Sequence, residues 1–200
     1  MMGAAGKPDR GRFVVISSPS GGGKTTLIKH LLERNESFTY SVSATTRPRR
    51  GDEENGAAYW FYTIAEFLQK RNAGDLLEWE EVYGDFYGTP KTFATEAVAE
   101  GKTVLFDLDV KGALRLKAIL PETLLIFISP PSLEILESRL RDRKTESEAR
   151  VQKRLAAAGD EIAKASQFDF TVVNDDLNDT VKQIEDIIHN SNPMGVGNYE

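Results

Sequence analysis

The sequence contains no cysteine, which excludes disulfide bonds, thiolate metal sites and a cysteine nucleophile. It has no apolar run long enough for a transmembrane helix, and residues 1–12 lack the apolar stretch of a signal peptide. The formal net charge of -6 argues against general nucleic-acid binding, because a phosphate backbone requires a basic surface. These absences predict a soluble, cytoplasmic protein that binds neither nucleic acid nor membrane.

The chain alternates between two kinds of apolar pattern. Short apolar runs without alternation are typical of parallel strands covered on both faces, and helical spacing of apolar residues lies between these runs. We therefore expect an α/β fold with a central parallel sheet between layers of helices. Ser132 and Asp179 are expected to cap two of its helices. The four predicted strands are 13–17, 103–107, 124–128 and 170–174.

Two stretches interrupt this alternation. Residues 35–90 are too long for one crossover helix and contain aromatic-rich runs and a capping box starting at Thr63, which predicts a β-rich insertion. Residues 139–155 are rich in arginine, and we interpret them as a lid. The predicted domain spans 13–189, with core segments 13–34, 91–131 and 168–189, a helix from 147 to 168, and flexible ends at 1–12 and 190–200.

The segment after the first predicted strand matches most of the pattern G-x-x-x-x-G-K-[ST]. Its glycines let backbone N–H groups turn toward phosphates, Lys24 can reach the β- and γ-phosphates, and the Thr25 hydroxyl can bind Mg²⁺. Ser18 replaces the first glycine of the pattern, and the alternative is a flexible Ser/Gly turn. We predict that this loop binds ATP through Ser18, Pro19, Ser20, Gly21, Gly22, Gly23, Lys24, Thr25 and Thr26.

Two carboxylates follow the second predicted strand. Asp107 ends the apolar run Val104 to Phe106, where an acid in a P-loop fold lies beside the metal. We predict Asp107 as a Mg²⁺ ligand together with Thr25. The alternative for Asp107 and for Asp109 is that either caps the helix near Gly112.

A second anion site is predicted in the insertion. Arg47, Arg49 and Arg50 occupy a loop of an acidic protein, and guanidinium groups suit a phosphate monoester. Glu78 lies in an apolar run, and a carboxylate there can accept both donors on the Watson–Crick edge of guanine. A solvated basic loop is the alternative. The surroundings favour a nucleoside monophosphate site, because they include Ser43, Tyr59 and Tyr87.

Taken together, these residues resemble the guanylate kinase family from about Phe13 to about Ile188. The resemblance implies an α/β fold of the P-loop NTPase type with three layers, and phosphoryl transfer from Mg·ATP to GMP or dGMP. The sequence leaves open whether the protein is a monomer or a homo-oligomer. The alternatives are a catalytically silent binding module of the same fold, or a kinase acting on another small phosphorylated molecule. The matching blocks are Ser20 to Thr25, Ser41 to Gly51, Glu54 to Gly56, Tyr59, Glu78-Trp79, Tyr87 to Thr89, Asp107 to Asp109, Thr145-Glu146 and Val173 to Leu177.

The resemblance also assigns roles residue by residue. It implies that Ser43, Glu78 and Asp109 read guanine, and that Asn174 contacts adenine. It implies that the GMP phosphate is bound by Arg47, Arg50, Tyr59 and Tyr87, with Thr89 nearby. The implied catalytic residues are Lys24, Arg47, Arg139, Arg143 and Arg154, of which the last three belong to the lid. Lys144 departs from the family pattern, since a glycine is common at that position.

Overall fold

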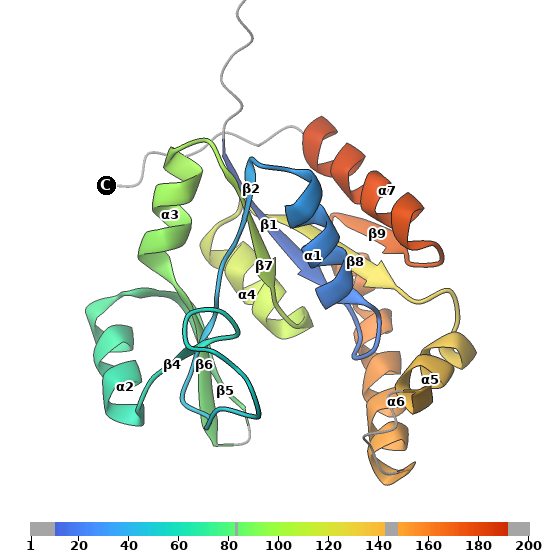
Figure 1. The fold of residues 1–200 in the computed structure, drawn as a ribbon, viewed down its shortest axis with the longest axis horizontal. Helices are drawn as coiled ribbons and strands as arrows, with labels where there is room; N and C mark the ends of the chain where they lie inside the picture. Colours follow the sequence, from blue (N-terminus) through green and yellow to red (C-terminus); the bar gives the residue numbers. More distant parts are fainter. Residues whose placement is uncertain (1–10, 83, 143–147, 192–200) are drawn as a thin grey trace, which may run out of the picture. The chain divides into compact units, whose positions relative to one another are not determined.

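The computed structural model describes residues 11–82, 84–142 and 148–191 (Figure 1). The chain divides into two compact units. The first unit contains Glu36–Phe106, and the second contains Val14–Asn35 and the chain from Asp107 onward. The predicted insertion at 35–90 is therefore part of a unit that continues to Phe106.

A five-stranded sheet has the order β2-β7-β1-β8-β9. Three of its pairings are parallel: β1 pairs with β8, β8 with β9, and β2 with β7. All four predicted strands are confirmed, and the fifth, β2, is too short and too mixed in character to be predicted. The strands are β1 (Arg12–Ser17), β2 (Phe38–Tyr40), β7 (Thr103–Asp107), β8 (Leu124–Ser129) and β9 (Phe170–Val173).

Helices cover both faces of the strands in the second unit. Figure 1 shows α1 (Lys24–Arg34) in front of β1 and β8, α7 (Leu177–Asn190) in front of β9, and α4 (Val110–Ile119) behind. α1 buries Leu27 and Leu31 completely, and α7 buries Ile184. These layers match the predicted three-layer arrangement, because apolar strands need cover on both faces.

The arginine-rich region forms a helical pair. α5 (Leu133–Asp142) begins after Ser132, whose hydroxyl accepts a hydrogen bond from Ile135 N–H at 3.2 Å, which confirms the predicted cap. α6 (Glu148–Ala163) is followed by the 3₁₀ helix η1 (Ala165–Gln167), so the predicted single helix is divided near its end. The predicted Arg143 and Lys144 lie outside the described residues. Leu136, Leu140, Val151 and Ala158 form a small core between the two helices.

The first unit carries a second, mixed sheet of order β4-β3-β6-β5. β5 (Leu76–Val82) and β6 (Asp85–Pro90) form an antiparallel pair, and β3 (Ala44–Thr45) pairs with β6 and with β4 (Trp60–Phe61). The helices are α2 (Ile64–Ala73) and α3 (Lys91–Ala99). α2 starts at the predicted capping box of Thr63 and Glu66. The β-rich character predicted for the insertion is confirmed.

One predicted cap is wrong. Asp176, and not Asp179, precedes α7, and its carboxylate accepts hydrogen bonds from the N–H groups of Asn178 and Asp179 at 2.8 and 3.0 Å. The helix begins at Leu177, so Asp179 lies in the first turn, where an acid favours the positive end of the helix dipole. Among the described residues, no helix combines the length and apolar character that a membrane crossing requires.

Candidate functional site

The predicted phosphate loop connects β1 to α1. Gly21 and Gly23 both have φ of +92°, a left-handed conformation that residues with a Cβ adopt at a cost. The Gly22 N–H donates to the Pro19 carbonyl at 2.9 Å, which closes the turn. The loop therefore ends directly at the N-terminus of α1, where backbone N–H groups and the helix dipole favour an anion.

Ser18, the departure from the glycine pattern, is accommodated by a later glycine. A Cβ placed on Gly22 would lie 2.9 Å from Ser18 Cβ and 3.0 Å from Ser18 Oγ. The Ser18 side chain is buried, and its hydroxyl donates to the Pro19 carbonyl at 3.1 Å. Because Gly22 has no side chain, there is room beside it for the side chain of Ser18.

Lys24 lies against the carboxyl end of β7. Its Nζ is 2.6 Å from Asp107 Oδ1 and donates to the Leu108 carbonyl at 3.0 Å. The next residue, Thr25, is exposed in the first turn of α1. The structure therefore places Lys24 next to the acid predicted from the apolar run. A hydroxyl and a carboxylate are both hard oxygen ligands, which fits Mg²⁺.

Asp109 caps a helix, which is the alternative role that the sequence analysis gave for it. It is the N-cap of α4, and its Oδ1 accepts a hydrogen bond from Gly112 N–H at 2.7 Å. The capping alternative is therefore confirmed for this oxygen. A part in reading guanine remains a prediction.

Asn174 is buried beside the phosphate loop. Its Nδ2 donates to the Gly22 carbonyl at 2.8 Å, and its backbone carbonyl accepts a hydrogen bond from Arg139 Nη2 at 3.0 Å. Two residues predicted for different purposes, Asn174 and Arg139, are thus joined at the loop.

Ser20 receives contacts from α6. Arg154 Nη1 donates to Ser20 Oγ at 3.0 Å, which brings a second predicted lid arginine to the loop. Glu161 lies on the same helix. Burial raises the pKa of the Glu161 carboxyl and the Asp109 carboxylate raises it further, while Lys24 and the Ser20 backbone N–H favour its charged form and oppose the shift. The sequence analysis missed Glu161, because one acid in a mixed-charge helix gives no signal of its own.

The predicted monophosphate and base readers share one face of the mixed sheet. Cross-strand partners Glu78 and Thr89 lie opposite each other, as do Tyr87 and Thr45. Thr45 is also paired with Phe61, and the Tyr59 ring lies 6.0 Å from the Phe61 ring. Ser43 directly precedes β3. Strand pairing therefore gathers Glu78, Tyr87 and Thr89 on one face in the first unit, with the Tyr59 ring beside Tyr87.

Arg47 lies beside the two tyrosines of this face. Its guanidinium carbon is 5.0 Å from the centre of the Tyr59 ring, and the Tyr59 and Tyr87 rings are 6.1 Å apart. Arg47 Nη1 and Nη2 donate to the two carboxylate oxygens of Glu53 at 2.7 and 2.6 Å. This bidentate pair raises the pKa of Arg47 and lowers the pKa of Glu53 to about 2.

Glu53 is a second site residue that the sequence analysis missed. Its carboxylate also accepts a hydrogen bond from Arg50 N–H at 2.8 Å, so it organises the turn that carries both predicted phosphate ligands. The available signal was its spacing, six residues after Arg47 and three after Arg50. Arg49 and Arg50 are exposed, and Arg49 lies 5.3 Å from the centre of the Phe61 ring.

Glu78 is the buried carboxylate of the base-reading face. Only 7% of its surface is exposed, and its Oε1 accepts a hydrogen bond from Thr89 Oγ1 at 2.6 Å. A buried carboxylate requires hydrogen-bond partners, and its two oxygens together can accept several donors. This arrangement suits a ligand that presents adjacent N–H groups.

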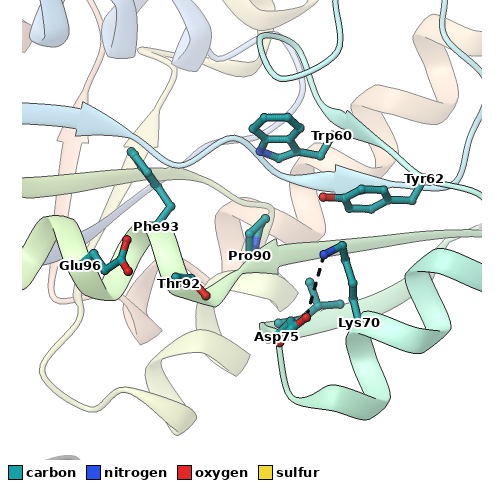
Figure 2. Close-up of a pocket in the computed structure, with 9 residues that line it drawn as sticks. Trp60, Tyr62, Lys70, Asp75, Pro90, Thr92, Phe93 and Glu96 are labelled. Carbon is teal, nitrogen blue, oxygen red and sulfur yellow. Dashed lines mark ion pairs between the residues drawn. The ribbon is translucent and has the colours of Figure 1, made fainter.

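The opposite face of the mixed sheet carries a separate groove of about 400 Å³ (Figure 2). Trp60, Tyr62 and Pro90 line it, together with Phe93 and Glu96 of α3. Lys70 closes one side and lies 4.0 Å from Asp75. Because side chains alternate along β4, Trp60 and Phe61 point to opposite faces, and the Tyr59 ring lies against Phe61, so this groove is not part of the predicted nucleotide site.

The described residues contain no group of three His, Cys, Asp or Glu side chains arranged to hold a metal. Any Mg²⁺ at Thr25 and Asp107 would therefore need most of its ligands from bound phosphates and water, as is usual for this ion.

Comparisons with known proteins identify the family of this chain. A family model described as guanylate kinase matches residues 10–191. A guanylate kinase from Synechocystis sp. (strain ATCC 27184 / PCC 6803 / Kazusa) is 45% identical, over 90% of this chain and 94% of the relative. One from Thermotoga maritima is 43% identical, over 90% and 86%. The crystal structure of guanylate kinase from Anaplasma phagocytophilum superposes with a TM-score of 0.73 at 34% identity, covering 90% of this chain and 86% of that one. This chain belongs to the guanylate kinase family.

Proposed function

We propose that this protein transfers the γ-phosphoryl group of ATP to GMP, and to dGMP, to give ADP and the corresponding diphosphate. The observation that carries the proposal is the single face of the mixed sheet that gathers Glu78, Tyr59 and Tyr87 beside Arg47. A buried carboxylate with a neighbouring cation and two phenols matches a purine with adjacent N–H donors and a 5′-phosphate.

In this proposal the second unit binds the donor. Lys24 and the N–H groups of the loop hold the β- and γ-phosphates of ATP. Thr25 and Asp107 would hold Mg²⁺, which neutralises charge on the phosphates when it is bound. Lys24 and Asp107 are in contact in the structure, so the carboxylate also fixes the position of the lysine.

The first unit binds the acceptor. Arg47 and Arg50, with Tyr59 and Tyr87, would bind the GMP phosphate, and Glu78 with Ser43 would read the base. Thr89 donates to Glu78 and so orients the carboxylate toward the nucleobase. No covalent intermediate is needed, since the GMP phosphate oxygen attacks the γ-phosphorus in line and the protein supplies positioning and charge.

Arg139, Arg143 and Arg154 are the proposed lid residues. Arg139 and Arg154 already contact residues of the phosphate-loop region, Asn174 and Ser20 respectively. Arginines that neutralise transition-state charge contribute about 10³–10⁵ in rate in related phosphoryl-transfer enzymes. The compartment we propose is the cytoplasm, where both nucleotide substrates occur.

A coupled ADP-release assay tests this function directly. We expect turnover with ATP and GMP, lower turnover with dGMP, and little with AMP, UMP or ribose 5-phosphate. Arg143→Ala should lower turnover steeply while circular dichroism shows an intact fold. Absence of ADP release with every acceptor would instead identify a silent binding module, and a preference for ribose 5-phosphate would identify a different kinase.

A further inference from the structure

We propose that Asn174 is a positioning residue for the phosphate loop, which sets the direction of the Gly22–Gly23 peptide and so acts on the triphosphate of any donor. This differs from the adenine contact that the family resemblance implies. The inference rests on the proposed phosphoryl transfer, and it concerns which part of the donor nucleotide depends on Asn174.

Asn174 is hydrogen-bonded to the sheet through its backbone and to the phosphate loop through its side chain. It directly follows β9, and its backbone N–H donates to the Ser129 carbonyl at 2.8 Å, which continues the pairing with β8. Only 7% of its surface is exposed. From this fixed backbone, Nδ2 donates to the Gly22 carbonyl at 2.8 Å in a buried hydrogen bond. The rigid sheet therefore anchors the loop through one side chain.

The geometry of a peptide group turns this anchor into control of a phosphate ligand. The Gly22 carbonyl and the Gly23 N–H belong to the same planar trans peptide, so they point in opposite directions. When Asn174 fixes the carbonyl on one side, the Gly23 N–H is directed to the other. Backbone N–H groups of such a loop are the groups that bind phosphates. Gly23 also precedes Lys24, so the same anchor orients the start of α1.

The glycine at position 23 is consistent with this role. A Cβ on Gly23 would lie 2.5 Å from Asn174 Nδ2, closer than real Cβ contacts come. The φ of +92° at Gly23 disfavours a side chain independently. The glycine is thus required both by the loop conformation and by the amide that lies against it.

Asn174 also links the loop to the lid helix α5. The backbone carbonyl of Asn174 accepts a hydrogen bond from Arg139 Nη2 at 3.0 Å, while its side-chain amide donates to the Gly22 carbonyl. α5 contacts the same loop directly, because a Cβ on Gly21 would lie 2.9 Å from Leu140 Cδ2 and 3.1 Å from Leu136 Cδ1. Loop and α5 are therefore built against each other, with Asn174 as the polar part of the contact.

The experiment compares Asn174→Ala with Asn178→Ala in the full chain. Asn178 is an exposed asparagine four residues later, and only its backbone N–H is used in the cap of α7. For each variant we would measure inhibition by inorganic tripolyphosphate and kcat/KM for ATP and for UTP as donors, with GMP saturating. Asn174→Ser, which keeps a small polar group, serves as a second variant if Asn174→Ala does not fold.

We expect the inhibition constant of tripolyphosphate to rise about tenfold in the Asn174 variant, the size typical of losing a buried hydrogen bond that orients a ligand. kcat/KM should fall by a similar factor for ATP and for UTP, and the KM for GMP should change less than about twofold. Asn178→Ala should match the wild type. A loss confined to ATP would show that Asn174 reads adenine and would overturn the proposal, as would unchanged tripolyphosphate inhibition. Turnover of the wild type with ATP and GMP tests the proposed function separately.

Discussion

Arg47 and Glu53 form a bidentate ion pair, with Nη1 and Nη2 of the arginine 2.7 and 2.6 Å from the two carboxylate oxygens. Because Glu53 also accepts the Arg50 N–H, it orients both residues proposed to bind the GMP phosphate. Glu53→Gln should therefore raise the KM for GMP by about tenfold, since a neutral amide cannot accept two charge-assisted hydrogen bonds. Initial rates at saturating ATP measure this effect.

The matched control for this prediction is Glu54→Gln, the exposed neighbour. It removes one negative charge from the same turn without touching Arg47. Equal effects of the two substitutions would mean that only net charge matters, and the orienting role of Glu53 would be rejected.

The same pair predicts a pH dependence of stability. The pKa of Glu53 falls from 4.5 to about 2 because of its hydrogen bonds to Arg47. A depressed carboxyl pKa stabilises the folded state above the unfolded-state pKa, and this contribution is lost as the pH falls toward the folded-state pKa. The difference in melting temperature between wild type and Glu53→Gln should therefore be constant above about pH 5 and shrink between about pH 4.5 and 2. A difference that grows on acidification would contradict the assignment.

Glu78 is expected to determine the choice of base. Glu78→Gln should weaken GMP binding by about tenfold, because the amide can accept only one of the two guanine donors well. Inosine monophosphate lacks the guanine amino group, so its affinity should fall less and the preference for GMP over it should narrow. Isothermal titration of both ligands measures this. Glu81→Gln, at an exposed position on the opposite face of β5, is the control and should retain the preference.

Lys24 is expected to make a large contribution to kcat. Its Nζ lies 2.6 Å from Asp107. Lys24→Ala should lower kcat by about a hundredfold or more, the size typical of removing one preorganised electrostatic contact to a developing charge. Lys29→Ala removes an exposed lysine of the same helix and should leave kcat unchanged. Single-turnover rates with intact ATP binding would locate the loss in the chemical step. Near-normal kcat in the Lys24 variant would exclude the proposed role.

Much of the fold could be predicted because its signals are local. Four parallel strands were identified by short apolar runs, and Thr63 was identified as a cap by the glutamate three residues later. β2 was missed because Phe38–Tyr40 is too short to show a pattern. The cap of α7 was misplaced because Asp175, Asp176 and Asp179 are all suitable residues, and only the backbone conformation selects Asp176.

The site was predicted less completely than the fold, for a physical reason. Lys24 and Asp107 could be predicted to lie together because Asp107 ends one recognisable strand and Lys24 lies in the loop after another. Glu53 and Glu161 were missed because their partners, Arg47 and the Ser20 N–H, are determined by tertiary structure and not by spacing. The Asn174 contact with Gly22 joins residues 152 positions apart, and no local pattern indicates it.

The misplaced cap gives a last prediction, which tests the structure apart from any function. Asp176 accepts two backbone N–H groups at the start of α7, and this helix buries Val181, Ile184 and Ile188 in the core. Asp176→Ala should lower the free energy of unfolding by about 1 kcal/mol, the usual cost of losing an N-cap. Asp179→Ala removes only a favourable charge near the helix dipole and should cost about 0.3–1 kcal/mol at low salt and less at high salt. Urea unfolding at both salt concentrations separates the two. If Asp179→Ala proved the more damaging substitution at high salt, α7 would begin later than the structure places it.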